Sequence, residues 1–177
     1  GWAKNELDYF VQAEQKNQGL SPTESAAKPD LLRRLYLDLT GLPPTPSDYE
    51  EFEKDNSGEA YEKQVDKLLK SPHFGEKWAA MWMDLARYSD TKGYEKDEAR
   101  SIWKYRDYII TSFNQNKPYD QFIKEQLAGD LLDNPQESDY IATAFHRNTT
   151  NNDEGDDEST YVDGIDERPI KVPKEYN

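Results

Sequence analysis

Two charged side chains occur inside otherwise apolar stretches of the sequence. Asp84 is the one charged residue in the segment 78–86, and a helix that is apolar on all sides is expected to be buried. Arg106 lies within an apolar stripe that includes Ile102 and Ile109. A buried carboxylate needs a partner, and an arginine cannot lose its charge. We therefore expect Arg106 to be largely buried and to form a charge-assisted contact.

Further polar residues extend this pattern along the chain. Gln126 and Asp130 follow Phe122 in steps of four residues, beside a second apolar stripe. The expected inward-facing network comprises Arg87, Asp90, Arg106, Gln126 and Asp130. We expect Arg106 to contact Asp84, Asp90 or Asp130, because its neighbour Asp107 points off the stripe. One interpretation of the network is a buried ionic cluster that fixes helix register; the alternative is a ligand-binding site.

The pair His146 and Arg147 ends a predicted helix. Cations at this position complement the negative end of the helix dipole, which is the interpretation that the sequence favours. The alternative is contact with an anion or substrate at the edge of the domain. The candidate ligand-binding residues are Arg87, Asp90, Arg106, Gln126, Asp130, His146 and Arg147, and the candidate buried network is Asp84, Arg106 and Asp130.

Metal and catalytic motifs are weak in this sequence. His73 and Glu76 stand three residues apart, but two ligands are too few for a metal, so we expect no metal site. The acidic residues of 153–158 do not match an EF-hand and are expected to form a solvated loop. No phosphate-binding glycine loop, serine nucleophile elbow or zinc-protease motif occurs. Carboxylates are abundant, but no pair is singled out as catalytic, so the catalytic residues remain unknown.

Composition excludes several function classes. The 177 residues carry a formal net charge of −14, which argues against nucleic acid and anionic membrane surfaces as partners. No apolar run approaches the length of a membrane-spanning helix. The absence of Cys excludes disulfides, thiolate metal sites and covalent c-type haem within this chain. We therefore expect no cofactor in the chain itself.

The elements that must position these residues are predicted to be helices. Apolar residues recur with helical periodicity, and no strand alternation is present. The predicted helices cover 3–17, 30–39, 46–54, 59–70, 75–88, 97–114, 118–132 and 136–146. We expect an all-α protein, an irregular multi-helix bundle of about seven to eight helices with an irregular acidic C-terminal tail. The predicted division is a helical domain over 1–150 and the tail over 151–177.

Three predicted helix starts share one pattern: a capping side chain, then Pro, with an acid three residues after the cap. They lie at 21–24, 45–48 and 134–137.

Several longer motifs occur in a fixed order. They are 31–45 (LLRRLYLDLTGLPPT), 71–76 (SPHFGE), 84–88 (DLARY), 105–110 (YRDYII) and 125–131 (EQLAGDL). The chain resembles, over roughly residues 5–155, the bacterial domain of unknown function that accompanies planctomycete-type cytochrome c domains. Relatives continue into a haem-type Cys-x-x-Cys-His motif, whereas this sequence has no Cys.

The resemblance implies a cellular setting. Relatives are large exported proteins that often carry a c-type cytochrome domain upstream and a second uncharacterised domain downstream. Some add lectin-like or immunoglobulin-like modules, which suggests polysaccharide. By this resemblance the expected location is the periplasm or cell surface, c-type haem belongs elsewhere in the full-length protein, and the partners are neighbouring domains and carbohydrate.

The expected function is that of an accessory, non-catalytic module in an exported, cytochrome-linked protein, with a role in handling polysaccharide. One alternative is a hydrolytic or redox enzyme domain whose pocket is built on the Arg/Asp network. A second alternative is a scaffold between domains. A concave pocket lined by the network favours an enzyme or ligand module, whereas a sealed network with an exposed apolar patch favours a scaffold.

Overall fold

The described part of the protein is helical throughout. The computed structural model describes residues 2–91, 97 and 99–148. Within these residues there are eight α-helices, two short 3-10 helices and no β-strand. One isolated β-bridge joins Thr91 to Ala99. The all-α prediction is therefore confirmed, while the acidic tail predicted for 151–177 lies outside the described residues.

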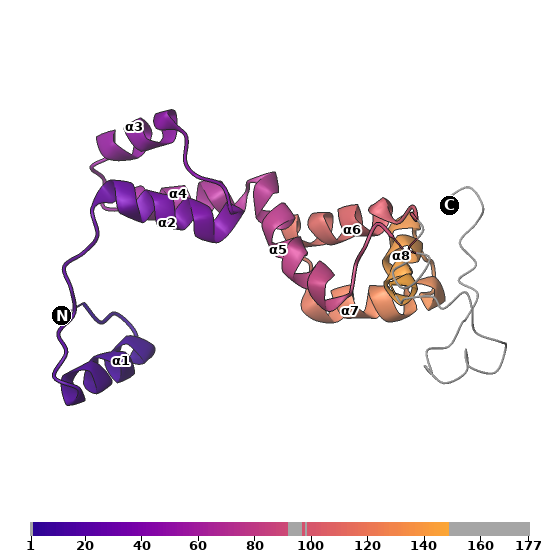
Figure 1. Cartoon of the computed structure of the whole chain (residues 1–177), viewed down its shortest axis with the longest axis horizontal. Coiled ribbons are helices and arrows are strands. Elements are labelled where there is room, and N and C mark those ends of the chain that lie inside the picture. Colours follow the sequence, from indigo (N-terminus) through magenta and orange to yellow (C-terminus); the bar gives the residue numbers. More distant parts are fainter. Residues whose placement is uncertain (1, 92–96, 98, 149–177) are drawn as a thin grey trace.

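The first four helices are α1 (Glu6–Asn17), α2 (Lys28–Thr40), α3 (Pro46–Lys54) and α4 (Ala60–Leu69). Helices α2, α3 and α4 pack together around one apolar cluster, the N-terminal core (Figure 1). Its buried members are Leu32, Leu35, Tyr36, Phe52, Ala60 and Leu68. The ammonium group of Lys28 caps the end of α3 by donating to the carbonyl oxygens of Phe52, Glu53 and Asp55 at 3.4, 3.1 and 2.9 Å.

The second half of the described chain forms a separate apolar cluster, the C-terminal core. Its elements are α5 (Pro72–Leu85), α6 (Trp103–Asn114), α7 (Tyr119–Ala128), η1 (Gly129–Leu131), α8 (Glu137–Ala142) and η2 (Thr143–Arg147). Its buried members are Ala79, Ala86, Ile102, Tyr105, Tyr108, Ile109, Phe122 and Ala142. Figure 1 shows α2 to α4 at one end of the molecule, α6 to α8 at the other, and α5 between them.

Helix α5 holds the two ends together through two close contacts. Lys77 donates from its ammonium group to the carbonyl oxygen of Leu37 at 2.6 Å, which satisfies the end of α2. Gly75 lies against α6, where its N–H donates to the side chain of Asn114 at 2.8 Å. A Cβ at Gly75 would stand 2.5 Å from the carbonyl oxygen of Ile110, so only glycine allows this approach.

The predicted helix starts have different outcomes. The start at Thr45 is confirmed, because Thr45 and Asp48 form a reciprocal capping box. The start predicted at 21–24 is wrong, because α2 begins at Lys28 and residues 21–27 carry no helix. At the start predicted for 134–137, the capping residue of α8 is Gln136, two residues after the predicted cap Asn134. Ser71 caps α5 ahead of Pro72, a start that the apolar periodicity missed.

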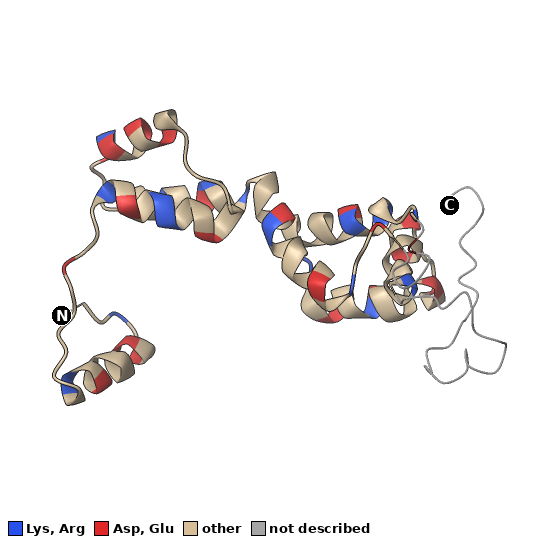
Figure 2. Cartoon of the chain, in the orientation of Figure 1, with Lys and Arg blue, Asp and Glu red and all other residues tan. Residues whose placement is uncertain are grey.

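Two helices expose more apolar surface than their sequences predict. Helix α1 has no buried residue, and Leu7 and Phe10 are exposed on it. On α5, Met81 and Leu85 are exposed, so the expectation that the tryptophan-rich segment is buried on all sides is wrong. Acidic and basic positions are interspersed along the helices at both ends of the molecule (Figure 2). In the described part of the chain, no helix combines the length and apolar character that a membrane crossing requires.

Candidate functional site

The predicted buried network of Asp84, Arg106 and Asp130 does not form. Asp84 is exposed on α5, and Asp130 is half-buried on η1, beyond the end of α7. Arg106 pairs with its neighbour Asp107 instead, from Nη2 to Oδ1 at 3.2 Å, with 41% of its side chain exposed. The prediction was wrong because the aliphatic stem of an arginine can cover apolar surface while its charged head reaches water.

The remaining predicted ligand residues lie around the loop between α5 and α6 and at the end of η2. Asp90 is exposed and accepts a hydrogen bond from the Tyr88 hydroxyl at 2.8 Å. Arg87 is exposed directly after α5. His146 has a ring nitrogen 3.2 Å from the carbonyl oxygen of Leu127, and Arg147 is exposed. A ligand-binding role for these side chains stays a prediction.

Gln126 is buried, as its place beside the apolar stripe predicts, but its partners are aromatic. Only 1% of the residue is exposed. Its side-chain oxygen accepts from the Trp82 indole at 2.9 Å and from the Tyr105 hydroxyl at 2.7 Å. Its amide nitrogen donates to the carbonyl oxygen of Phe122 at 3.1 Å. Gln126 therefore satisfies two aromatic polar groups inside the C-terminal core and is not part of an ionic network.

Glu125 is a buried charge that sequence reasoning missed. Its carboxylate accepts from the Tyr108 hydroxyl at 2.8 Å, from Gln121 at 2.7 Å and from the ammonium group of Lys117. The side chains of Lys117 and Glu125 are only 15% and 5% exposed. The signal that could have found it is the spacing of Gln121 and Glu125, four residues apart on one helix face.

These contacts shift the pKa values of the groups involved. Burial alone would raise the pKa of Glu125, but the hydrogen bonds from Lys117, Tyr108 and Gln121 outweigh it and the pKa lies below its ordinary value. Burial, and then the hydrogen bond to Glu125, raise the pKa of the Tyr108 hydroxyl. Glu125 is thus held ionised and fully bonded, which fits a structural role and leaves it unavailable as a catalytic base.

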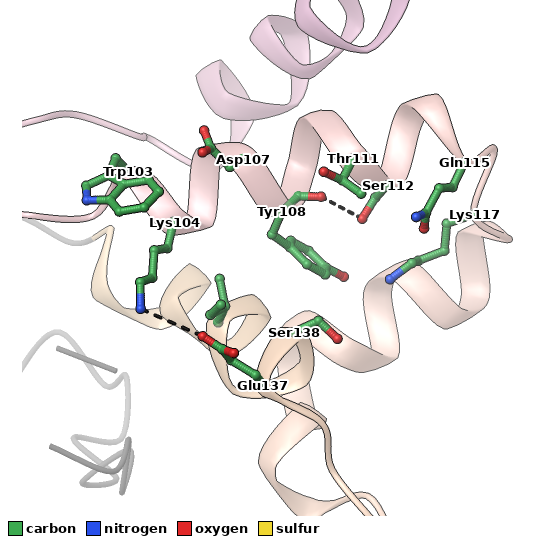
Figure 3. A pocket seen from close by; sticks show the side chains of 11 residues that line it. Trp103, Lys104, Asp107, Tyr108, Thr111, Ser112, Gln115, Lys117, Glu137 and Ser138 are labelled. Atoms are coloured by element: carbon green, nitrogen blue, oxygen red, sulfur yellow. Dashed lines mark hydrogen bonds and ion pairs between the residues drawn. The ribbon is translucent and has the colours of Figure 1, made fainter. Parts of the chain in front are cut away.

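Beside this buried pair lies an open groove of about 430 Å³ between α6 and α8. Figure 3 shows Trp103 and Lys104 at one end, Gln115 and Lys117 at the other, and Tyr108 between them. Glu137 and Ser138 of α8 form the opposite wall. The remaining lining residues are Asp107, Thr111, Ser112 and Ile141. A Lys104–Glu137 ion pair at 3.8 Å joins the two helices across the groove.

The lining of the groove is suited to binding a polar ligand. Trp103 is 49% exposed, so part of its indole ring is accessible to a ligand. Hydroxyl and amide groups of Thr111, Gln115 and Ser138 supply donors and acceptors. The carboxylates of Asp107 and Glu137 are each paired with a cation, Arg106 and Lys104. The groove therefore combines a partly exposed aromatic ring with hydroxyl and amide groups and with charged side chains that are held in ion pairs.

Metal ligands do not gather in the described residues. His73 and Glu76 contact each other at 2.6 Å on the exposed start of α5. Across residues 2–91, 97 and 99–148, no group of three or more His, Asp or Glu side chains is placed to hold a metal ion. The acidic residues of 153–158 lie outside the described part of the chain.

Comparison with protein families identifies the chain. Residues 6–174 match the model of PSCyt2, described as a protein of unknown function (DUF1549), and the chain belongs to this family. No curated protein and no solved structure matches the chain. The family assignment agrees with the domain of unknown function that the sequence motifs indicate.

Proposed function

We propose that this chain is an accessory, non-catalytic module of an exported protein that also carries cytochrome c domains, and that the groove between α6 and α8 binds carbohydrate. The single observation that carries the proposal is the half-exposed Trp103 at one end of a groove lined by hydroxyl and amide groups and by charged side chains that are held in ion pairs. Sugar rings offer apolar C–H faces for an aromatic ring and hydroxyl groups for hydrogen bonds. The proposed location is the periplasm or cell surface, with haem on another domain.

The groove favours binding over catalysis. Among its carboxylates, Asp107 and Glu137 are each paired with a cation, and the nearby Glu125 is buried and accepts three hydrogen bonds. A hydrolytic site needs a carboxylate free to exchange a proton with substrate or water. The Arg/Asp network, on which the alternative of an enzyme pocket depends, is also not formed. These points support a module that holds its ligand without transforming it.

Affinity electrophoresis through gels that contain soluble polysaccharides tests this proposal. We expect one or more polysaccharides to retard the parent protein. Trp103→Ala should weaken binding about tenfold or more, equal to about 1.4 kcal/mol. Trp2→Ala is the matched control, because Trp2 is also exposed but does not line the groove. The proposal fails if no polysaccharide retards the parent, or if both substitutions weaken binding equally.

A second candidate function, a scaffold between domains, is favoured by the exposed apolar face of α1. Leu7, Phe10 and Val11 are all exposed on this helix, at spacings that place them on one side. Such a face is suited to docking against a neighbouring domain of the full-length protein. In the full-length protein, Leu7→Ser with Phe10→Ser should release α1 from the neighbouring domain. The chain around α1 should then be cleaved faster in limited proteolysis. Unchanged cleavage would count against docking by α1.

A further inference from the structure

The groove between α6 and α8 is elongated, because it follows α6 from its first residue to the residue that ends it. The lining residues from this helix and its cap are Trp103, Lys104, Asp107, Tyr108, Thr111, Ser112 and Gln115. They form one continuous face of the helix, since positions four residues apart are neighbours on a helix surface. At a rise of about 1.5 Å per residue, this face extends roughly 18 Å along the axis from Trp103 to Gln115.

The outer edge of this face is a row of four exposed side chains, which we call the α6 row. Its members are Trp103, Asp107, Thr111 and Gln115, and all four are exposed and line the groove. Successive members are separated by about 6 Å along the axis, and a row of this kind slants by about 26° from it. A ligand that contacts the whole α6 row must therefore be long and narrow.

The α6 row offers a suitable contact group at each step. Part of the indole ring of Trp103 is accessible at one end, and the amide of Gln115 lies at the other (Figure 3). Between them are the carboxylate of Asp107 and the hydroxyl group of Thr111. Asp107 is paired with Arg106, but a carboxylate has acceptor sites for about four hydrogen bonds, so it can also accept from a ligand hydroxyl. Every member of the row can therefore contact a sugar ring or its hydroxyl groups.

The walls of the groove favour a glycan over an extended peptide. Both walls are helices, whose backbone N–H and C=O groups bond within the helix. Extended peptides are commonly recognised by backbone hydrogen bonds along the edge of a sheet, and α6 and α8 present no such edge. The Lys104–Glu137 ion pair joins the walls with both side chains partly exposed, so a ligand that follows the α6 row lies over this pair. Recognition must then come from side chains at regular intervals.

The spacing of the α6 row is close to the repeat of a sugar chain. A pyranose ring with its linking oxygen extends about 5 Å, as covalent bonds of about 1.5 Å require. The row has steps of about 6 Å and a length of roughly 18 Å, which accommodates about three to four rings in succession. The groove volume of about 430 Å³ is also large enough for more than one ring.

We propose that the groove binds a linear glycan that lies along α6, with about three to four consecutive sugar rings in contact with the α6 row. This inference rests on the proposed function, because it names the shape and length of the carbohydrate bound in the same groove. The ligand is an extended chain and not a single sugar, a disaccharide or a branched cluster. Trp103 contacts the ring at one end of the chain, and Gln115 contacts hydroxyl groups of the ring at the other end.

A length series of oligosaccharides tests the inference. Linear oligosaccharides of two to six rings are prepared from a polysaccharide that retards the parent protein, and their affinities are measured by isothermal titration calorimetry. We expect affinity to rise about tenfold or more between two and four rings, and to change less than about twofold from four to six.

The outcomes of the length series separate this inference from the proposed function. Equal affinity for the disaccharide and the hexasaccharide overturns the inference, while carbohydrate binding stands. A gain that continues through five and six rings also overturns it, because the contacts would then extend beyond the α6 row. If neither the polysaccharides nor the oligosaccharides bind, the proposed function fails and the inference fails with it.

Substitutions at the two ends of the α6 row test the placement of the chain. Trp103→Ala should weaken the binding of every oligosaccharide that binds. Gln115→Ala should reduce the gain in affinity from two to four rings by about threefold, the effect of one hydrogen bond. Gln18→Ala is the matched control, because Gln18 is likewise the exposed residue that ends a helix, in this case α1, and it does not line the groove.

The placement along α6 is overturned by either of two results. In the first, Gln115→Ala leaves the gain from two to four rings unchanged, so that the far end of the chain does not reach Gln115. In the second, Gln18→Ala reduces the gain as much as Gln115→Ala does, so that the effect is not specific to the groove. A reduced gain in Gln115→Ala alone supports a chain that extends from Trp103 to Gln115.

Discussion

The two cores of the molecule differ in what they bury. The N-terminal core is formed by aliphatic and aromatic side chains, and its ion pairs are near the surface, such as Lys67 with Asp48 and Glu51 at 3.0 and 2.8 Å. The C-terminal core buries the carboxylate of Glu125 and the amide of Gln126 among its rings. Because buried polar groups are costly unless bonded, this second core has the more exacting geometry.

The candidate site, the groove between α6 and α8, lies beside the core that buries polar groups. Tyr108 and Lys117 line the groove on one side and bond to Glu125 on the other. The ring of Tyr108 also stacks between Tyr105 and Phe122, with centroids 6.4 and 6.2 Å away. Side chains fixed by packing and by hydrogen bonds make a rigid wall for a ligand. The N-terminal core has no comparable buried carboxylate among its described residues.

Removing the cation of each region should give the largest contrast. Lys117→Met leaves the carboxylate of Glu125 buried without its ammonium partner and should destabilise the protein by about 3–5 kcal/mol. Lys67→Met removes a cation whose side chain is 44% exposed and should cost about 0–1 kcal/mol. Urea unfolding followed by circular dichroism measures both values. Similar losses in the two variants would show that the cores do not differ in this respect.

A methyl group placed between helices should give the next largest effect. Gly75→Ala forces a Cβ against the backbone of α6 and should cost about 1–3 kcal/mol, because backbone atoms cannot easily move away. Gly58→Ala in the N-terminal half meets no atom within 4 Å and should change stability by less than about 0.5 kcal/mol. Thermal unfolding of both variants is the measurement. A neutral Gly75→Ala would mean that the contact between α5 and α6 is loose.

Protonation of the buried carboxylate should give a smaller, pH-dependent effect. The folded pKa of Glu125 lies below its ordinary value, so its stabilisation is present above the unfolded pKa of about 4.3 and is lost as pH falls through the folded pKa. Glu125→Gln removes the charge but keeps a side chain that can accept a hydrogen bond from Lys117, so it should cost about 1.5–3 kcal/mol at neutral pH, less than Lys117→Met. Unfolding curves from pH 7 to acid should converge for parent and variant. If the difference in unfolding free energy between the two proteins does not change with pH, the stabilisation does not come from the charge of Glu125.

The fold was predictable from sequence because its signals are local. Helical periodicity and one capping box fix most of the elements, and the predicted helix at 46–54 matches the structure at both ends. The start predicted at Ser21 failed because capping side chains also favour turns and extended segments without a following helix. The α6 boundary was predicted six residues early, at 97 instead of 103, because its first residues belong to the loop that contains Arg100.

The site was less predictable because it depends on contacts between helices. The sequence identified the polar residue at Gln126 but paired it with arginines, since periodicity gives the face of a helix and not the neighbour it meets. Lys117 follows the end of α6, where no helical pattern applies, so its pairing with Glu125 could not be inferred. Arg106 was misplaced because a long side chain can lie on an apolar stripe and still reach solvent.

The smallest expected effect concerns the residues that end the helices in the two halves of the molecule. Helix α2 ends at Gly41 with φ of +72°, whereas the residue in the left-handed conformation after α5 is Arg87, with φ of +55°. The N–H of Tyr88 donates to the carbonyl oxygen of Met83 at 2.9 Å, and that of Arg87 to Asp84 at 3.2 Å. This is the Schellman arrangement, in which glycine is the usual residue at the position of Arg87.

Replacing Arg87 by glycine should therefore stabilise the protein. An L-residue in this conformation costs about 1–2 kcal/mol, and the extra freedom of glycine in the unfolded chain offsets part of the gain. Arg87→Gly should raise stability by about 0.5–1 kcal/mol, because no hydrogen bond of the Arg87 side chain occurs among the described residues. Asn116, with φ of +48° after α6, is the control: asparagine tolerates this conformation, so Asn116→Gly should be nearly neutral. Urea midpoints at an unchanged m-value measure the difference. If Arg87→Gly destabilises the protein, the arginine side chain contributes a contact that outweighs the backbone cost.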